Sequence, residues 1–238
     1  MISFVVPAHN EEALLARTLA SIHVAAKAAG ADYELIVVDD ASTDCTAQIA
    51  LEHGARVVRV AARQISAVRN AGAREATGDL LVFVDADTIL PPETLAAALA
   101  ALRAGAIGGG ARIAFDEPVP LWAHLTAALI IGYMRLRRWA AGCFVFVRRE
   151  AFVAVGGFDE EVFAAEELIL SQALKQQGKF VILRERVVTS ARKAQRYRAG
   201  EMLWLATKMA CGGRKAIRRR EGLELWYQRR EEKPGKTV

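Results

Sequence analysis

Apolar runs alternate with helix-like segments along the first half of this chain, and this alternation limits its possible folds more than any other feature. Five short runs, most of them rich in Val, Ile and Leu, are expected to be strands: residues 2–7, 33–40, 56–61, 80–87 and 106–115. Segments with helical spacing lie between them: residues 11–30, 42–54, 65–78 and 93–104. Strands that alternate with helices of this length predict βαβ units and a parallel sheet.

Beyond residue 115 the expected elements are less regular. They are a strand at 143–147, a short helix, a Gly-Gly turn, an amphipathic helix at 166–177, two short extended runs after residue 180, and a helical tail. The helix expected at 42–54 has Ser42 or Thr43 as its N-cap. The glycines at 108–110 lack the phosphate-loop pattern and instead predict close backbone packing.

The most apolar stretch, Leu121–Met134, is 14 residues long, whereas about 20 residues are needed to span a bilayer. We favour a helix that covers the sheet and keep an interfacial helix facing lipid as the alternative. The amino terminus has neither a basic segment nor a long apolar one, so no secretory signal is expected. Cys45, Cys143 and Cys211 form no CxxC pair, which favours a reducing compartment.

Charge is distributed unevenly along the chain. The net charge is +5, but the segment from Arg192 onward holds 14 Lys and Arg against 5 Asp and Glu, so the residues before it are mildly acidic. This asymmetry predicts a polyanionic partner such as anionic lipid, nucleic acid or a phosphorylated substrate, and a solvated basic helix is the alternative. Because no nucleic-acid-binding motif is recognised, we expect no nucleic-acid partner.

Two acidic pairs close predicted strands, Asp39/Asp40 and Asp85/Asp87. In open parallel sheets, ligands bind beyond the carboxyl ends of the strands, where both pairs fall. Carboxylates suit Mg²⁺ or Mn²⁺, which can neutralise a departing diphosphate, so Asp85 and Asp87 are candidate metal ligands. Asp39 and Asp40 are candidates for hydrogen bonds to a base or to ribose hydroxyls. For each pair the alternative is a helix cap or a solvated loop.

Charged residues near other strand ends are also candidates for ligand binding, but each has a simpler structural explanation. Arg63 and Arg69 lie around a loop and a helix start, and arginine is well shaped for phosphate. Surface exposure explains either arginine equally well. Glu11 favours a helix N-terminus electrostatically. His9 could bind a metal ion, but we prefer the interpretation that it forms structural hydrogen bonds.

Five segments occur together in the order seen in family-2 glycosyltransferases of the GT-A fold, which the chain resembles over residues 2–193. These segments are FVVPAHNEEALLARTLAS, ELIVVDDASTDCT, AVRNAGAREATGDLLVFVDADT, AAGCFVFVRREAFVAVGGFDE and AAEELILSQALKQQGK. The resemblance implies an α/β fold with a Rossmann-like, mostly parallel sheet flanked by helices. It also implies a nucleotide-sugar-binding half over residues 1–115 and an acceptor half over 116–193. Residues 194–238 are then a basic helical C-terminal extension.

The resemblance further implies roles for individual residues. The nucleotide-sugar pocket is assigned to the first strand end, the VDD pair, the basic segment and the DxD triplet: Pro7, Ala8, Asn10, Glu11, Asp39, Asp40, Arg63, Arg69, Asp85, Ala86 and Asp87. Within this set Asp40 contacts the base, Asp85 serves ribose or metal, and Asp87 binds Mg²⁺ or Mn²⁺ at the diphosphate.

The catalytic base of the family is the Asp of an ED pair at a helix start, and here the pair is Glu166-Glu167. The base position falls on Glu167, whose side chain is one methylene longer and can still accept a proton. A QxxRW motif and a late metal-binding His, which occur in other members, are not found. Arg192 and Lys193 lie near the place of that His, and we expect one of them to contact phosphate.

The implied function is that of an inverting, metal-dependent hexosyltransferase. Its donor would be UDP- or GDP-linked, and its acceptor a hydroxyl of a lipid-linked molecule or a cell-envelope glycan precursor. The basic tail with Trp204 and Trp226 suits an anionic membrane surface, which predicts a cytoplasmic protein peripheral to the inner face of the membrane. Alternatively, Trp204 packs on the body as core.

Two other functions are kept as alternatives. One is a catalytically silent protein that binds a sugar nucleotide or a membrane surface, and it is favoured by Glu167 and by the missing late His. The other is a sugar-phosphate nucleotidyltransferase, which would open with a Gly-rich basic loop where this chain has the acidic PAHNEE.

Overall fold

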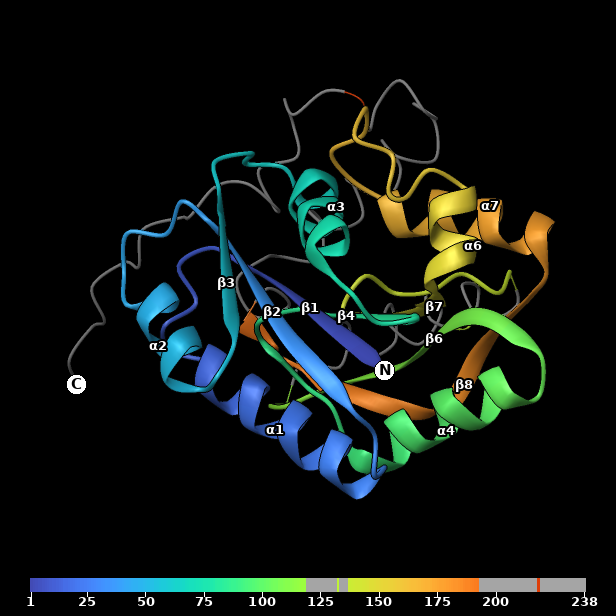
Figure 1. Ribbon diagram of the computed structural model, residues 1–238, viewed down its shortest axis with the longest axis horizontal. Coiled ribbons are helices and arrows are strands. Elements are labelled where there is room, and N and C mark those ends of the chain that lie inside the picture. Colours follow the sequence, from blue (N-terminus) through green and yellow to red (C-terminus); the bar gives the residue numbers. More distant parts are fainter. Residues whose placement is uncertain (119–131, 133–136, 193–217, 219–238) are drawn as a thin grey trace.

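The computed structural model describes residues 1–118, 132, 137–192 and 218, which form an α/β structure with helices on both faces of a sheet (Figure 1). Within these residues the sheet has eight strands in the order β3-β2-β1-β4-β7-β6-β8-β5. The strands are β1 (Ile2–Ala8), β2 (Tyr33–Asp40), β3 (Arg56–Val60), β4 (Leu80–Val84), β5 (Thr88–Ile89), β6 (Ala106–Phe115), β7 (Phe144–Arg148) and β8 (Lys179–Thr189). The helices are α1 (Leu15–Ala28), α2 (Thr46–Glu52), α3 (Ile65–Glu75), α4 (Pro92–Arg103), α6 (Arg149–Ala154) and α7 (Glu166–Gln177).

The amino-terminal half of the sheet is parallel, as predicted. Strand β1 lies between β2 and β4 and pairs in parallel with both, and β2 also pairs in parallel with β3. The register sets Ala8, the last residue of β1, opposite Asp39 of β2. These strands therefore end at one edge of the sheet, where the loops that follow them can build a common site.

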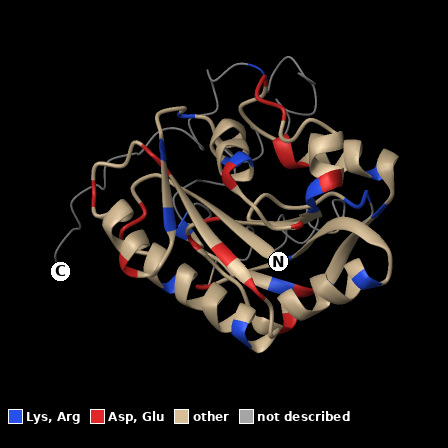
Figure 2. Cartoon of the chain, viewed as in Figure 1, with Lys and Arg blue, Asp and Glu red and all other residues tan. Residues whose placement is uncertain are grey.

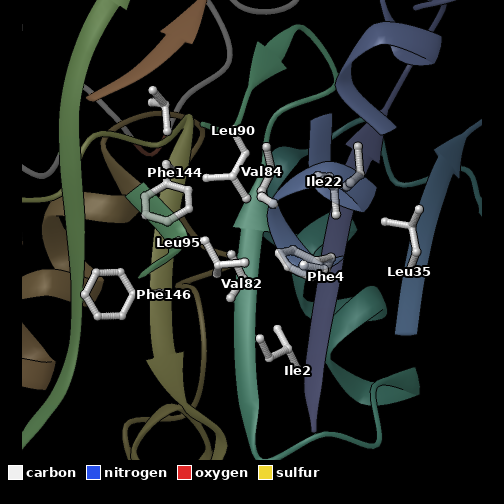
Figure 3. Packing of buried hydrophobic residues seen from close by; sticks show 14 of the residues in the cluster. Ile2, Phe4, Ile22, Leu35, Val82, Val84, Leu90, Leu95, Phe144 and Phe146 are labelled. Atoms are coloured by element: carbon white, nitrogen blue, oxygen red, sulfur yellow. The ribbon is translucent and has the colours of Figure 1, made fainter. Parts of the chain in front are cut away.

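Burial on both faces explains why the strands are apolar at consecutive positions. Helices α1, α2 and α4 cover one face, and α3, α6 and α7 cover the other (Figure 1). In β1, Phe4 belongs to the cluster beneath α1 and α4, whereas the next residue, Val5, belongs to the cluster on the opposite face. Figure 3 shows the first cluster, in which Ile22 of α1 and Leu95 of α4 pack with Phe4 and Val82 of the sheet.

The carboxyl-terminal half of the sheet is mixed. Strand β7 pairs antiparallel with β4 and β6, and β8 pairs in parallel with β6 and antiparallel with β5. The prediction of two short extended runs after residue 180 is wrong, because Lys179–Thr189 forms one strand. Its middle carries Arg184, Glu185 and Arg186, and the register with β6 shifts beside them, after Gly110. A polar segment at a register shift does not have the alternating pattern of a regular strand.

The glycines of β6 allow neighbouring strands to approach closely. A Cβ atom at Gly109 would lie 2.2 Å from the carbonyl oxygen of Val181 on β8. One at Gly108 would lie 2.8 Å from the carbonyl oxygen of Phe146 on β7. The close backbone packing predicted for these glycines is therefore confirmed.

Two helices begin later than their sequences indicate. Helix α1 starts after Glu11 and not at it, and α2 starts at Thr46, so the predicted N-cap at Ser42 or Thr43 is wrong. The reason is a contact between the loops that follow β1 and β2. The backbone N–H of Asn10 donates to Ser42 Oγ (3.0 Å), and Asn10 Oδ1 accepts the backbone N–H of Thr43 (2.8 Å).

Several predicted features cannot be placed in this fold. Apart from Gly132 and Arg218, the apolar stretch at 121–131 and 133–134 and the C-terminal extension with its two tryptophans lie outside the described residues, as do Lys193 and Cys211. Among the helices of the described ranges, none is both long and apolar enough to cross a membrane.

Candidate active site

A cavity of about 470 Å³ opens at the carboxyl edge of the parallel strands. Its wall is formed by the ends of β1 and β2, by the segments after β1, β3 and β4, by the loop before β7, and by the starts of α3 and α7. The lining residues are Pro7, Ala8, His9, Glu11, Asp40, Arg63, Gln64, Ile65, Val68, Arg69, Asp85, Ala86, Asp87, Gly142, Cys143, Ala165, Glu166, Glu167 and Leu168. A cavity of this size at this edge is the expected place for a small-molecule ligand.

Most of the site residues named from the sequence meet in this cavity. They are Pro7, Ala8, Glu11, Asp40, Arg63, Arg69, Asp85, Ala86, Asp87, Glu166 and Glu167. Asn10 and Asp39 lie in the adjoining loops and are not among its described lining residues. Arg192 reaches the rim through an ion pair with Glu11.

Asp40 ends β2, and its carboxylate is ordered by the loop after β3. The backbone N–H of Arg63 donates to Asp40 Oδ1 at 3.0 Å. The ring of His9 connects the same two residues, with Nδ1 2.8 Å from the Asp40 carbonyl oxygen and Nε2 3.2 Å from Arg63 Nη1. Because a guanidinium can only donate, Nε2 accepts and Nδ1 carries the proton. His9 therefore has a structural role at the cavity wall.

Asp39 and Asn10 hold the loops at the cavity edge. Asp39 Oδ1 accepts the backbone N–H of Ser42 at 3.1 Å, and Asn10 bonds the same loop. Four of the five non-glycine residues with positive φ in the described chain lie in segments around the cavity: Asn10, Ala41, Arg63 and Ala165. Such backbone conformations are costly and persist only where the surrounding structure enforces them, which is common at functional sites.

Arg69 of α3 is a buried arginine that joins three segments of the chain. Its side chain is 2% exposed. Nη1 donates to Glu166 Oε1 at 2.6 Å, and Nη2 donates to Asp85 Oδ1 at 2.8 Å and to the Gly142 carbonyl oxygen at 2.9 Å. Figure 2 shows the resulting closeness of α3 to the acidic start of α7. Burial opposes the charge of Arg69, but Asp85 and Glu166 together raise its pKa, so the guanidinium stays charged.

The sequence suggested that Arg69 contacts a base or a phosphate, yet both of its Nη atoms have protein partners. Residues 69, 85, 142 and 166 are distant in the chain, and no local pattern reveals that they meet. The paired arginine holds two acidic side chains of the cavity in fixed orientations, which is a role that sequence reasoning missed.

Glu166 and Glu167 begin α7 but have different surroundings. Glu166 is ion-paired with Arg69, whereas Glu167 lines the cavity without an ion pair among the described residues. Burial, and then the neighbouring charge of Glu166, raises the pKa of Glu167 to about 8, against the opposing effect of Arg69. A carboxyl group with such a pKa is suited to exchange a proton near neutral pH.

Asp87 is held from several directions. Its carbonyl oxygen accepts the Ser190 N–H at 3.2 Å. Its Oδ1 accepts hydrogen bonds from Thr88 Oγ1 at 3.4 Å and Thr189 Oγ1 at 3.3 Å, and its Oδ2 accepts one from Arg192 Nη2 at 3.2 Å. The carboxylate is thus preorganised at the cavity before any ligand binds.

The cavity is acidic for a site that would bind a diphosphate. Among the described residues that line it, six are carboxylates and two are arginines. Mg²⁺ and Mn²⁺ suit such oxygen donors, and they commonly take one or two protein carboxylates and complete their coordination with water and substrate phosphates. Within the described ranges, no three His, Cys, Asp or Glu side chains converge as a complete metal site. The carboxylates of the cavity fit an ion whose remaining coordination positions water and a phosphorylated ligand fill.

Comparison with known proteins assigns a family to this arrangement. The model of the family described as glycosyl transferase family 2 matches residues 3–158. An undecaprenyl-phosphate 4-deoxy-4-formamido-L-arabinose transferase of Shewanella sediminis is 37% identical over 101 residues, which are 40% of this chain and 30% of that protein. A validoxylamine A glucosyltransferase of Streptomyces hygroscopicus subsp. limoneus is 33% identical over 107 residues, 42% of this chain and 23% of that protein. The matches thus span less than a third of these relatives.

Solved structures share the fold at low sequence identity. The mannosyltransferase PcManGT of Pyrobaculum calidifontis, in complex with GDP-Man and Mn²⁺, has a TM-score of 0.63 and 21% identity over 85% of this chain and 59% of that chain. S. aureus TarS 1-349, in complex with UDP-GlcNAc, has a TM-score of 0.62 and 20% identity over 87% of this chain and 64% of that chain. The architecture is the GT-A fold of glycosyltransferases. Since the family model also covers most of the sequence, the chain belongs to glycosyl transferase family 2.

Proposed function

We propose that this protein transfers a sugar from a nucleotide diphosphate sugar to an acceptor, with a divalent metal ion and with inversion at the anomeric carbon. The observation that carries the proposal is the meeting of Asp40, Asp85, Asp87 and Glu167 in one cavity at the ligand-binding edge of the sheet. Neighbours in fold were solved with GDP-Man and Mn²⁺ or with UDP-GlcNAc, which supports this class of donor.

The donor would lie across the ends of β1 and β2. Asp40 would accept a hydrogen bond from the base, and Arg63 would add positive charge at the cavity wall. Asp85 and Asp87 would hold the divalent ion, which supplies positive charge beside the diphosphate. Arg69 supports this arrangement by orienting Asp85 and not by contacting the donor.

Glu167 would serve as the base for a hydroxyl acceptor. It takes the hydroxyl proton while the acceptor oxygen forms a bond to the anomeric carbon. The bond between that carbon and the diphosphate oxygen breaks, and its electron pair leaves with the nucleoside diphosphate. Attack opposite the leaving group inverts the anomeric configuration. The raised pKa makes ionised Glu167 a stronger base than an ordinary carboxylate.

We propose a lipid-linked acceptor, supported by the undecaprenyl-phosphate named in the Shewanella sediminis relative. The chemistry separates two kinds of acceptor. A phosphate monoester has a second pKa of about 6 and is largely ionised at neutral pH, so it needs no base. A hydroxyl acceptor needs one. Transfer that survives the loss of the Glu167 carboxylate would therefore indicate a phosphate acceptor.

Calorimetric titration tests the donor site. The protein is titrated with UDP, GDP, ADP and their common sugar forms, each with and without Mn²⁺. We expect Mn²⁺-dependent binding of one nucleotide and its loss in Asp87→Ala. Asp79→Ala, at an exposed aspartate outside the cavity, is the matched control and should bind as the wild type does. Absence of binding by every nucleotide in folded wild-type protein would refute the proposal.

Turnover separates the transferase from a silent nucleotide-sugar binding protein, the alternative function. After the donor is known, release of its nucleoside diphosphate is measured with a panel of isoprenoid phosphates and sugar acceptors. A transferase releases the nucleotide in an acceptor-dependent manner. Donor binding without any release across the panel would favour the silent binding protein.

We also propose that the protein works at the cytoplasmic face of a membrane, through its basic C-terminal residues. A basic residue near an anionic surface contributes about 1 kcal/mol to binding. The full-length chain should therefore cosediment with anionic liposomes, and substitution of residues 218–220, all arginines, by glutamine should weaken that binding at low salt. Equal cosedimentation of the two proteins would contradict the proposal.

A further inference from the structure

Arg192 forms an ion pair with Asp87, the carboxylate that would bind a metal ion in the proposed function. Its Nη2 lies 3.2 Å from Asp87 Oδ2 and 2.8 Å from Glu11 Oε2. Among the described residues, Arg192 is the one arginine or lysine whose side chain contacts Asp87. The donor-free protein therefore neutralises part of its acidic cavity with its own side chain.

The backbone around Arg192 is fixed, while its side chain is partly exposed. The Ser190 N–H donates to the Asp87 carbonyl oxygen at 3.2 Å, and the Ala191 N–H donates to Asp116 Oδ1 at 2.9 Å. The Arg192 side chain itself is 45% exposed. Its guanidinium can therefore leave Asp87 without any rearrangement of the sheet.

The other arginines at the cavity are not placed to do this. Arg69 is buried and held by Asp85, Glu166 and a carbonyl group. The Nη1 atom of Arg63 donates a hydrogen bond to Nε2 of His9. Arg192 thus combines contact with Asp87, partial exposure and a position at the rim, where an incoming diphosphate would pass.

We propose that Arg192 is an internal counter-ion that competes with the divalent metal for Asp87 and transfers its charge to the donor diphosphate when metal and donor bind together. The inference rests on the proposed function, because it concerns the same metal and diphosphate. A metal ion that arrives alone must break the pair between Arg192 and Asp87 without replacing it. A metal ion that arrives with a diphosphate offers the released guanidinium a new anionic partner. Metal and nucleotide therefore bind cooperatively, each raising the affinity for the other.

The test uses Arg192→Gln in the full-length chain and measures two affinities. The first is for MnCl₂ without nucleotide, from the electron paramagnetic resonance signal of free Mn²⁺. The second is for UDP or GDP at saturating Mn²⁺, by calorimetry. We expect Mn²⁺ alone to bind about fivefold more tightly than to the wild type, as the loss of one partly exposed competing ion pair predicts. The nucleoside diphosphate should bind about fivefold more weakly.

Opposite changes in the two affinities distinguish this role from a general disturbance of the site, which would weaken both. Arg192→Lys keeps the charge and should hold Mn²⁺ affinity within about twofold of the wild type. Arg56→Gln removes an arginine from an exposed ion pair outside the cavity and should change neither affinity. Asp87→Asn combined with Arg192→Gln should abolish the gain in Mn²⁺ binding.

Unchanged or weaker binding of Mn²⁺ alone by folded Arg192→Gln would overturn the inference, even where nucleotide binding confirms the proposed function. If no nucleotide binds to the wild type, the proposed function fails, and the comparison with Mn²⁺ alone still decides whether Arg192 competes for Asp87. Should Arg192→Gln not fold, Arg192→Met, which keeps the apolar part of the side chain and removes its charge, should raise Mn²⁺ affinity in the same direction.

Discussion

Adjacent glutamates at the start of α7 have different chemistry because of what surrounds each of them. Glu166 forms a direct ion pair with the buried Arg69. Glu167 is half-buried and would add another negative charge beside Glu166, so the protonated form is favoured and the pKa rises to about 8. A carboxyl group with a raised pKa destabilises the folded protein when it ionises. Such a loss of stability is common where function requires a group with an unusual pKa.

Glu167→Gln should therefore stabilise the donor-free protein while reducing transfer. In the unfolded chain Glu167 ionises near its ordinary pKa of 4.5, and in the folded protein near 8. The folded state binds the extra proton between these values, so the wild type loses stability across that window as pH rises. The variant should be equally stable near pH 4 and more stable by on the order of 4 kcal/mol at pH 8, measured by urea denaturation.

The same variant should lose about 10²- to 10⁴-fold in transfer to a hydroxyl acceptor, since general-base catalysis contributes that much. Donor affinity, measured by calorimetry, should stay close to that of the wild type. Glu150→Gln, at an exposed helix position, is the control for both measurements. A stability difference that does not change with pH would show that Glu167 ionises normally in the folded protein.

At the scale of elements, how well the sequence predicted the structure depended on burial. Strands β1, β2 and β4 were foreseeable because both faces of the sheet are covered, so each strand has at least four consecutive apolar residues. Strand β8 was predicted as two runs because polar residues occupy its middle. The start of α2 was misplaced because Ser42 and Thr43, ordinary capping residues, bond to Asn10 across a loop contact that no local pattern encodes.

The site residues were also predictable only where a local sequence pattern reflects the fold. Asp40, Asp85 and Asp87 were identifiable because each falls at or just after the end of a parallel strand, and the sheet brings such ends together. The contact of Arg69 with Asp85 and Glu166 was not identifiable, because it depends on packing between α3 and α7 over nearly a hundred residues of sequence. Topology can be inferred from local patterns, whereas partners within a buried polar cluster cannot.

Gly109→Ala tests the close packing of β6. The new Cβ atom would lie 2.2 Å from the Val181 carbonyl oxygen, so β6 and β8 must separate. We expect a loss of about 2–3 kcal/mol in the free energy of unfolding, from urea titration, because the overpacked atom is backbone and cannot rotate away. Gly54→Ala is the comparison: its Cβ meets open space and only its φ of +72° is unfavourable, which costs about 1 kcal/mol. Equal losses would refute packing as the cause.

At the scale of the whole molecule, Arg69 connects several elements of the fold at once. It extends from α3 in the parallel half to the loop before β7 and to the start of α7, and it meets the end of β4 on the way. Its guanidinium also lies over the ring of Phe158, so a further segment of the chain contacts Arg69. A buried charge shared by so many elements ties the geometry of the cavity to the integrity of the fold.

Arg69→Met should therefore destabilise the whole molecule and not the cavity alone. Removing the guanidinium leaves Asp85 and Glu166 close together without their buried counter-ion, which costs about 3–5 kcal/mol. Urea denaturation should show this loss as a lower midpoint with an unchanged slope. Arg56→Met, in an exposed pair with Glu75, should cost less than about 1 kcal/mol. Adding Glu166→Gln to Arg69→Met should restore part of the stability, because it removes the buried negative charge of Glu166, which Arg69 had balanced. A double variant no more stable than Arg69→Met would show that the lost packing of the arginine, and not its charge, holds these elements together.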